Sequence, residues 1–226
     1  MEQKKITPSH TMELPRLIVV GEKNIGKIGD FLKSLNNTKK VSLISGSNVK
    51  KIVQKKIDES LASSNIKKSW YLSKINDRKS IKEIEKNVRK NKTDLLIGVG
   101  GGRSVDIAKM IAFNLCKPFV SIPTSASHDG IASPFVSVKG EKPHSMVATA
   151  PLGVFVDVDI IKKAPKELLA SGCGDLIAKI TAVHDWQLGN SKTGEYYGRY
   201  SAHLALMSAK ILIENSSRFA KKGPDV

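Results

Sequence analysis

The chain has 226 residues, 40% of them hydrophobic, and a formal net charge of +16 at pH 7. This length is enough for one large domain, or for one domain and part of another. The sequence contains no apolar run near the roughly 20 residues that span a bilayer, and residues 1–16 lack the apolar centre of a signal peptide. We therefore expect a cytoplasmic protein without stable membrane insertion.

The positive charge is spread along the sequence. Lysine pairs recur at 4–5, 39–40, 50–51, 55–56, 67–68, 162–163 and 221–222. Aromatic residues make up only 5% of the chain and are not interleaved with these pairs, so bases would find few stacking platforms. We expect solvated lysine faces whose field attracts an anionic substrate, and no nucleic acid partner. The two cysteines are too few for a disulfide framework; we expect Cys116 in the core and Cys173 in a turn.

Strand and helix patterns alternate through the first half of the chain. Short apolar runs predict strands at 17–20, 41–44, 70–72, 95–99 and 118–122. Helical spacing of apolar residues separates them, over 25–35, 49–61, 81–88 and 104–115. This alternation predicts an α/β fold, a Rossmann-like parallel sheet with helices on both faces. Ligands of such sheets bind at the carboxyl ends of the strands.

The second half begins differently and ends in helices. Residues 133–149 predict a hairpin with Gly140 in its turn, and 152–158 predict a further strand. Long helical patterns follow over 165–188 and 195–215. We place a boundary near Lys162. It separates a dinucleotide-binding α/β domain, 1–162, from the first part of an all-helical metal and substrate domain, 163–226.

A glycine run closes the strand predicted at 95–99. Glycine has no Cβ, so Gly100, Gly101 and Gly102 can bring bare N–H groups to a phosphate, and the following helix adds a partial positive charge. Arg103 stands where the last glycine of G-x-G-x-x-G would be. A plain tight turn that binds no phosphate therefore remains the alternative interpretation. We expect Ser104 at or near the N-cap and Asp106 in the first turn, either holding the loop or only complementing the helix dipole.

Three stretches, GGGRSVDIAK, IPTSASHDGIASPFVSV and SGCGDLIAKITAVHDW, together resemble one family. It is the sn-glycerol-1-phosphate dehydrogenases, part of the superfamily of iron-containing alcohol dehydrogenases, glycerol dehydrogenases and dehydroquinate synthases. SHDGIASP is the most specific piece. The resemblance runs from about Leu14 to the C-terminus. Members of the family are considerably longer, and the part without a counterpart is most of the C-terminal helical domain.

The resemblance implies a cofactor, NADP or NAD. It implies as ligands Gly102, Arg103, Ser104, Val105, Asp106, Thr124, Ser125, Ala126, Ser127 and Ser133, in addition to Gly100 and Gly101, which glycine chemistry already assigns to the pyrophosphate. Selective NAD sites often carry an acid after the second strand, but here that strand ends in Ser45-Gly46-Ser47-Asn48, followed by Lys50 and Lys51. We expect NADPH to be accepted, unless these lysines are only solvated helix residues.

The resemblance also implies that Asp129 and Asp175 contact the substrate and that Asp175 is a catalytic ligand of Zn²⁺. The residue alone allows a simpler role, since an acid at a helix start caps the helix. Zinc would need one Asp and two His. Neither family histidine is matched by any of the five present: His10, His128, His144, His184 and His203. We expect the two zinc-ligating histidines of the family to lie beyond Val226. His128 lies in the signature without an assigned role.

The reaction implied is the NAD(P)H-dependent reduction of dihydroxyacetone phosphate to sn-glycerol 1-phosphate, the backbone of archaeal ether lipids. Zinc would polarise the carbonyl while the nicotinamide delivers hydride. A glycerol dehydrogenase or a dehydroquinate-synthase-like enzyme on the same scaffold is the alternative, and a basic nucleic-acid-binding protein is a weaker one. A homo-oligomer is compatible with the sequence. We expect this chain to bind cofactor but to show little turnover.

Overall fold

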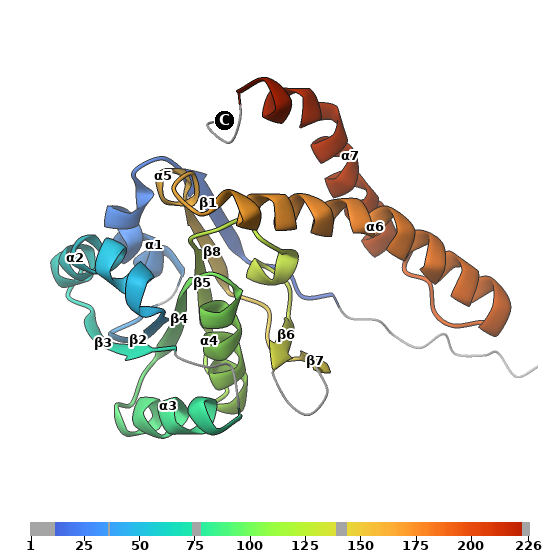
Figure 1. Cartoon of the computed structure of the whole chain (residues 1–226). Helices are drawn as coiled ribbons and strands as arrows, with labels where there is room; N and C mark the ends of the chain where they lie inside the picture. The colour runs from blue at the N-terminus through green and yellow to red at the C-terminus, as the bar shows by residue number, and fades with distance from the viewer. Residues whose placement is uncertain (1–11, 36, 74–77, 139–143, 223–226) are drawn as a thin grey trace, which may run out of the picture.

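A six-stranded parallel sheet forms the centre of the computed structural model, which describes residues 12–35, 37–73, 78–138 and 144–222. Figure 1 shows the sheet with helices around it. Its strand order is β1-β8-β5-β4-β2-β3. The strands are β1 (Leu17–Gly21), β2 (Lys40–Ser45), β3 (Lys67–Leu72), β4 (Leu95–Gly100), β5 (Phe119–Pro123) and β8 (Gly153–Asp157). The predicted α/β fold with a parallel sheet is confirmed.

Helices cover the two faces of the sheet in two separate apolar clusters. On one face pack the 3₁₀ helix η1 (Asn24–Lys27), α1 (Ile28–Leu35) and α2 (Ser47–Ser63). On the other pack α3 (Arg78–Lys90) and α4 (Gly102–Asn114). Every residue of β4 and β5 is buried, as expected of strands covered on both sides.

The connections diverge between β2 and β4, which are neighbours in the sheet. From β2 the chain passes through α2 to β3, and from β4 it passes through α4, on the opposite face, to β5. Neighbouring strands whose crossovers leave in opposite directions open a crevice at their carboxyl ends. The glycine run lies at this switch point.

The hairpin predicted at 133–149 forms beside α4. Strands β6 (Phe135–Val138) and β7 (His144–Val147) pair antiparallel. Gly140, the expected turn residue, lies outside the described residues. Val136 is buried against the α4 face of the core, so the hairpin is packed onto the domain rather than suspended from it.

The chain ends in long helices. After the short α5 (Val158–Ile161), α6 (Lys166–Thr193) extends away from the sheet (Figure 1). The last helix, α7 (Arg199–Lys222), packs against α6. Only Gly172 and Val183 of α6 are buried. In the described part of the chain, no helix has the length and apolar character needed to span a membrane. The assignment of 163–226 to a separate helical domain stays a prediction.

Both expectations for the cysteines were wrong. Cys116 is exposed, because it directly follows the C-cap of α4 with φ 49°, the left-handed conformation that ends many helices. Cys173 lies inside α6, not in a turn.

Candidate functional site

The glycine run presents a helix N-terminus at the carboxyl edge of the sheet. Gly100, the last residue of β4, has φ +145°, which favours glycine. Gly101 is the N-cap of α4, and no side chain caps that helix. The first N–H groups of a helix have no partner within it, so this end of α4 is suited to an anion. Gly101 itself has φ −77°, and a Cβ there would lie an ordinary 3.5 Å from Ser125 Oγ. The fold therefore does not require glycine at 101.

Ser104 and Asp106 have other local roles than predicted, because α4 begins at Gly102, two residues earlier than expected. Ser104 Oγ lies 2.8 Å from Ser73 Oγ and so joins α4 to the end of β3. Asp106, the fifth residue of α4, is past the first turn, and its Oδ2 accepts the N–H of Ser137 at 3.2 Å. Burial raises the pKa of Asp106. Both side chains anchor neighbouring segments to α4.

A cleft of about 280 Å³ lies between α2 and the start of α6, at the switch point. Apolar side chains of α2 form one wall, and the glycine run and small hydroxyl residues form the other. Its lining includes Val49, Ile52, Val53, Gly101, Thr124, Ser125 and Lys163. An apolar wall facing a helix N-terminus suits a nucleotide, with the base on the first and phosphate on the second.

The lysine that lines this cleft is Lys163, which the sequence analysis did not single out. Lys50 turns instead towards β3, where its Nζ lies 5.6 Å from the centroid of the Trp70 ring, and Lys51 is exposed. Lys163 follows β8 and α5, so the strand order of the sheet, rather than sequence spacing, brings it to the cleft.

His128 connects the glycine run to the segment that follows β5. Its Nδ1 accepts the N–H of Gly130 at 2.9 Å, which places the ring proton on Nε2. A Cβ on Gly102 would overlap Nε2, and a Cβ on Gly130 would overlap the ring. The imidazole is therefore held between two glycines, against the first turn of α4.

Lys109 holds the same segment from the α4 side. It is fully buried, and its Nζ donates to the carbonyl oxygens of Gly130 and Phe135, both at 2.7 Å. Burial lowers the pKa of Lys109 to about 8, although Asp106 and Asp129 favour its charged form. This residue was not predicted from the sequence. Its signal is a lysine inside an otherwise apolar helix, AKMIA, where a solvated lysine is not expected.

Asp129 and Asp175 converge, as the resemblance implied. The backbone N–H of Asp129 donates to Asp175 Oδ2 at 2.9 Å. Lys179 Nζ lies 2.5 Å from Asp129 Oδ2 and 3.9 Å from Asp175 Oδ1. Burial opposes the charge of Lys179, but its hydrogen bond to Asp129 and the two carboxylates outweigh burial and raise its pKa. Lys179 was also missed, and its signal is the i,i+4 spacing from Asp175.

Asp175 is not a helix cap. It is the tenth residue of α6, and the glycines before it are helical rather than part of a turn. Glycine is needed at 172 because of a tertiary contact: a Cβ there would overlap the carbonyl oxygen of Ala126. Ser171 Oγ donates to the carbonyl oxygen of Ser127 at 3.2 Å in the same place. Gly172 thus lets α6 approach the 124–128 segment closely enough to bring Asp175 to Asp129.

A second pocket, of about 270 Å³, adjoins the cleft. The cleft is lined by Thr124 and Ser125, and the pocket by the next residue, Ala126. Its walls are the segment after β5, α6 and Leu212 of α7, and they include His128, Asp129, Ile131, Leu169, Cys173, Asp175 and Leu176. Within the described ranges, no three His, Cys, Asp or Glu side chains are grouped to hold a metal. Of the three predicted zinc ligands, the described residues therefore supply one, Asp175.

Four other predicted cofactor residues are not among those that line the two cavities: Arg103, Val105, Ser127 and Ser133. Ser127 is buried with its Oγ 3.5 Å from Ser125 Oγ, and Ser133 donates its N–H to the carbonyl oxygen of Asp129 at 3.3 Å. Val105 is fully buried in the core, so only its backbone is placed near the loop. Arg103 is an exposed residue of the first turn of α4. Their contacts with a cofactor stay predictions.

Comparison with known proteins agrees with this architecture. The family model for iron-containing alcohol dehydrogenase matches residues 19–165. A protein of Nitrosopumilus maritimus (strain SCM1), named glycerol-1-phosphate dehydrogenase [NAD(P)+], is 64% identical over 217 residues, which are 96% of this chain and 61% of that protein. A protein of the same name from Cenarchaeum symbiosum (strain A) is 61% identical over 218 residues, 96% of this chain and 62% of that protein.

Solved structures share the fold at lower identity. The crystal structure of glycerol dehydrogenase from Schizosaccharomyces pombe superimposes with a TM-score of 0.83 and 23% identity, covering 93% of this chain and 55% of that one. The chain thus spans about three-fifths of the length of the curated relatives it matches. On the family match, which extends from β1 to the residue before α6, this chain belongs to the iron-containing alcohol dehydrogenase family.

Proposed function

We propose that this chain carries the cofactor cleft and part of the substrate site of an NAD(P)-dependent sn-glycerol-1-phosphate dehydrogenase. The observation that carries the proposal is the adjacency of two cavities at one edge of the sheet. One is lined by the uncapped N-terminus of α4, and the other is lined by Asp129 and Asp175, whose carboxylates contact Lys179. The names of the relatives that are 64% and 61% identical support the same activity.

The cofactor would lie with its pyrophosphate at the start of α4. The N–H groups of Gly101 and Gly102 and the hydroxyls of Thr124 and Ser125 would hold the phosphate oxygens, and the apolar wall of α2 would take the adenosine end. None of the described residues that line the cleft is acidic, and Lys163 adds a positive charge. This supports acceptance of NADPH as well as NADH. When bound, the nicotinamide supplies or takes the hydride.

The substrate would lie in the adjoining pocket. The three charged groups Asp129, Asp175 and Lys179 carry a net charge of about −1, which favours a cation and substrate hydroxyls over a phosphate at this point. Ile131, Leu169 and Leu176 would exclude water from the reacting end. We propose Asp175 as a zinc ligand, although the residues that the structure describes do not complete a zinc site.

The test of this activity uses a chimera. The chain would be joined to the part of the 64% identical relative that follows the matched residues, because the match spans 61% of that protein. The assay follows NAD(P)⁺ reduction with sn-glycerol 1-phosphate, sn-glycerol 3-phosphate or glycerol. We expect oxidation of sn-glycerol 1-phosphate alone. Preferential oxidation of glycerol would support a glycerol dehydrogenase instead. A folded chimera that binds NADPH but oxidises none of the three would also contradict the proposal.

A further inference from the structure

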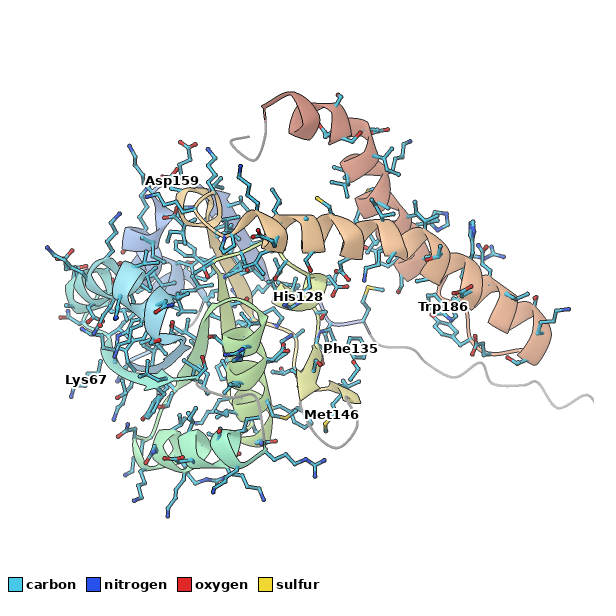
Figure 2. All side chains as sticks on the ribbon, in the orientation of Figure 1. Lys67, His128, Phe135, Met146, Asp159 and Trp186 are labelled. Atoms are coloured by element: carbon cyan, nitrogen blue, oxygen red, sulfur yellow. The ribbon has the colours of Figure 1, made fainter. Side chains whose placement is uncertain are left out.

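A larger concave surface lies at the other edge of the sheet, where β2 and β3 begin. It encloses about 740 Å³, and its walls include Lys33, Thr38, Lys39, Lys40, Ser64 and Lys67, which we call the basic pocket. Lys40 and Lys67 pair in register at the first residues of β2 and β3. Each strand continues for five further residues to its carboxyl end, about 17 Å along the strand. Figure 2 shows Lys67 well apart from His128, which lies at the candidate site.

The positive charge of the basic pocket is only partly balanced. None of its described lining residues is acidic, and none of its four lysines forms an ion pair with a carboxylate within the described ranges. The carboxylate held beside it is Asp94, whose Oδ2 accepts the N–H groups of Lys39 at 3.1 Å and Lys40 at 2.8 Å.

The ends of two helices also reach this edge. The carbonyl ends of α1 and α2 each contribute roughly −0.5 charge. At α1 that charge is already partnered, because Arg16 donates to the carbonyl oxygen of Leu35 at 3.1 Å. Against four lysines, Asp94 and the end of α2 leave about 2.5 positive charges without a counter-charge.

One wall of the basic pocket contains a buried hydroxyl without a partner. Thr38 is 8% exposed, and its Oγ1 makes no hydrogen bond with the described part of the chain. Buried hydroxyls in proteins are almost always hydrogen-bonded. This oxygen is almost wholly shielded from solvent, so an oxygen of a bound ligand would accept from the hydroxyl once the Thr38 side chain turns towards the pocket. A ligand with oxygen acceptors and about two negative charges satisfies both Thr38 and the lysines.

We propose that the basic pocket binds a small phosphorylated anion, at a site separate from the dinucleotide cleft. A phosphate group has the required charge and acceptors, and lysine ammonium groups bind it as point charges. The concave shape favours a free anion over a flat lipid surface, because the lysines surround a cavity instead of forming a plane. This proposal does not depend on the enzyme activity proposed above.

The test is a titration of the ¹⁵N-labelled 226-residue chain with pyrophosphate, followed by NMR. We expect saturable shifts of the amide signals of 37–40 and 64–67. They should persist in Gly101→Val, which removes the binding expected at α4. The double variant Lys39→Gln/Lys67→Gln should weaken binding at these amides by about tenfold or more. Lys55→Gln/Lys56→Gln, which removes the same charge from exposed positions of α2, should not.

The variant Thr38→Val distinguishes a specific pyrophosphate site from a general attraction of anions to the lysines. Replacing an unpartnered buried hydroxyl by a methyl group should leave the ligand-free protein as stable or more stable, while weakening pyrophosphate binding. The absence of saturable shifts at 37–40 would overturn the proposal. So would an equal loss of binding in both lysine double variants. Binding to phosphatidic acid vesicles that depends on Lys39 and Lys67, without pyrophosphate binding, would show a membrane-facing surface instead.

Discussion

The backbone N–H of Asp129 donates to Asp175 Oδ2 at 2.9 Å, although the two residues are 46 positions apart in the sequence. Asp129 comes from the segment after β5 and Asp175 from the middle of α6, and Lys179 lies between their carboxylates. This contact joins the α/β sheet to the long helices at the point where the substrate is proposed to bind. Substitutions can test which side chains this contact between the sheet and α6 depends on.

Lys179→Met should leave two neighbouring carboxylates without their counter-charge. Because Asp129 is 53% exposed, the expected loss is modest, about 0.5–1 kcal/mol of unfolding free energy. The amide of Asp129 should also exchange its hydrogen faster. Urea denaturation and hydrogen exchange measure both effects. The matched control is Lys210→Met, which removes a more exposed i,i+4 pair with Glu214 and should have no measurable effect. Equal effects in the two variants would show that Lys179 is only a surface charge.

Gly172→Ala and Gly174→Ala should have opposite effects, although both residues lie inside α6. At Gly172 the new methyl group would overlap the carbonyl oxygen of Ala126 and force α6 away from the 124–128 segment. At Gly174 nothing lies within 4 Å, so alanine should stabilise the helix by about 0.5–1 kcal/mol. Thermal unfolding shows whether each substitution raises or lowers the stability of the protein. Stabilisation by Gly172→Ala would contradict the close docking of α6.

Lys109 should make stability rise with pH above neutrality. Its pKa in the folded protein is about 8, against 10.5 in the unfolded chain, so between these values the unfolded chain binds more protons. The unfolding free energy should therefore increase from about pH 8 to 10.5, by on the order of 2–3 kcal/mol from this group. Denaturation of the parent chain and of Lys109→Met at pH 7.5 and 10 isolates the contribution as a difference. Identical pH dependences would show that Lys109 does not titrate in this range.

The 226-residue chain should bind NADPH or NADH yet turn over slowly. The glycine run and the cleft are complete within the described residues, whereas the metal has only one predicted ligand there. Cofactor fluorescence and a reduction assay with dihydroxyacetone phosphate measure the two properties on one sample. Rapid, zinc-dependent reduction by this chain would contradict the expectation.

The fold was predictable because its signals are local. Alternating apolar runs and helical stripes placed the strands of the sheet within a few residues, and glycines after β4 marked the switch point. That Asp129 and Asp175 both contact the substrate was implied by the family resemblance alone, and the hydrogen bond between them was not predicted. Nothing in the spacing of two aspartates 46 residues apart indicates contact.

The errors share a physical cause, which is tertiary contact. Gly172 and Gly174 suggested a turn because glycine weakens helices, but at 172 the missing Cβ makes room for another backbone. Lys109 and Lys179 were not singled out from the sequence, because the groups that hold each of them come from a distant segment. Ser104 was expected at or near the N-cap because serine often caps helices; Gly101 is the N-cap, and the Ser104 hydroxyl contacts Ser73 instead.

The central claim is that the N-terminus of α4 holds the cofactor phosphates, and Gly101→Val tests it most directly. Since Gly101 has ordinary backbone angles and a Cβ there meets only Ser125 Oγ, at 3.5 Å, valine should leave the fold intact and obstruct only the approach of the ligand. Gly26→Val, at an exposed glycine with open space around it, is the control. Calorimetric titration with NADPH should give a Kd at least about tenfold higher for Gly101→Val and an unchanged Kd for Gly26→Val. An unchanged Kd in folded Gly101→Val would contradict the account.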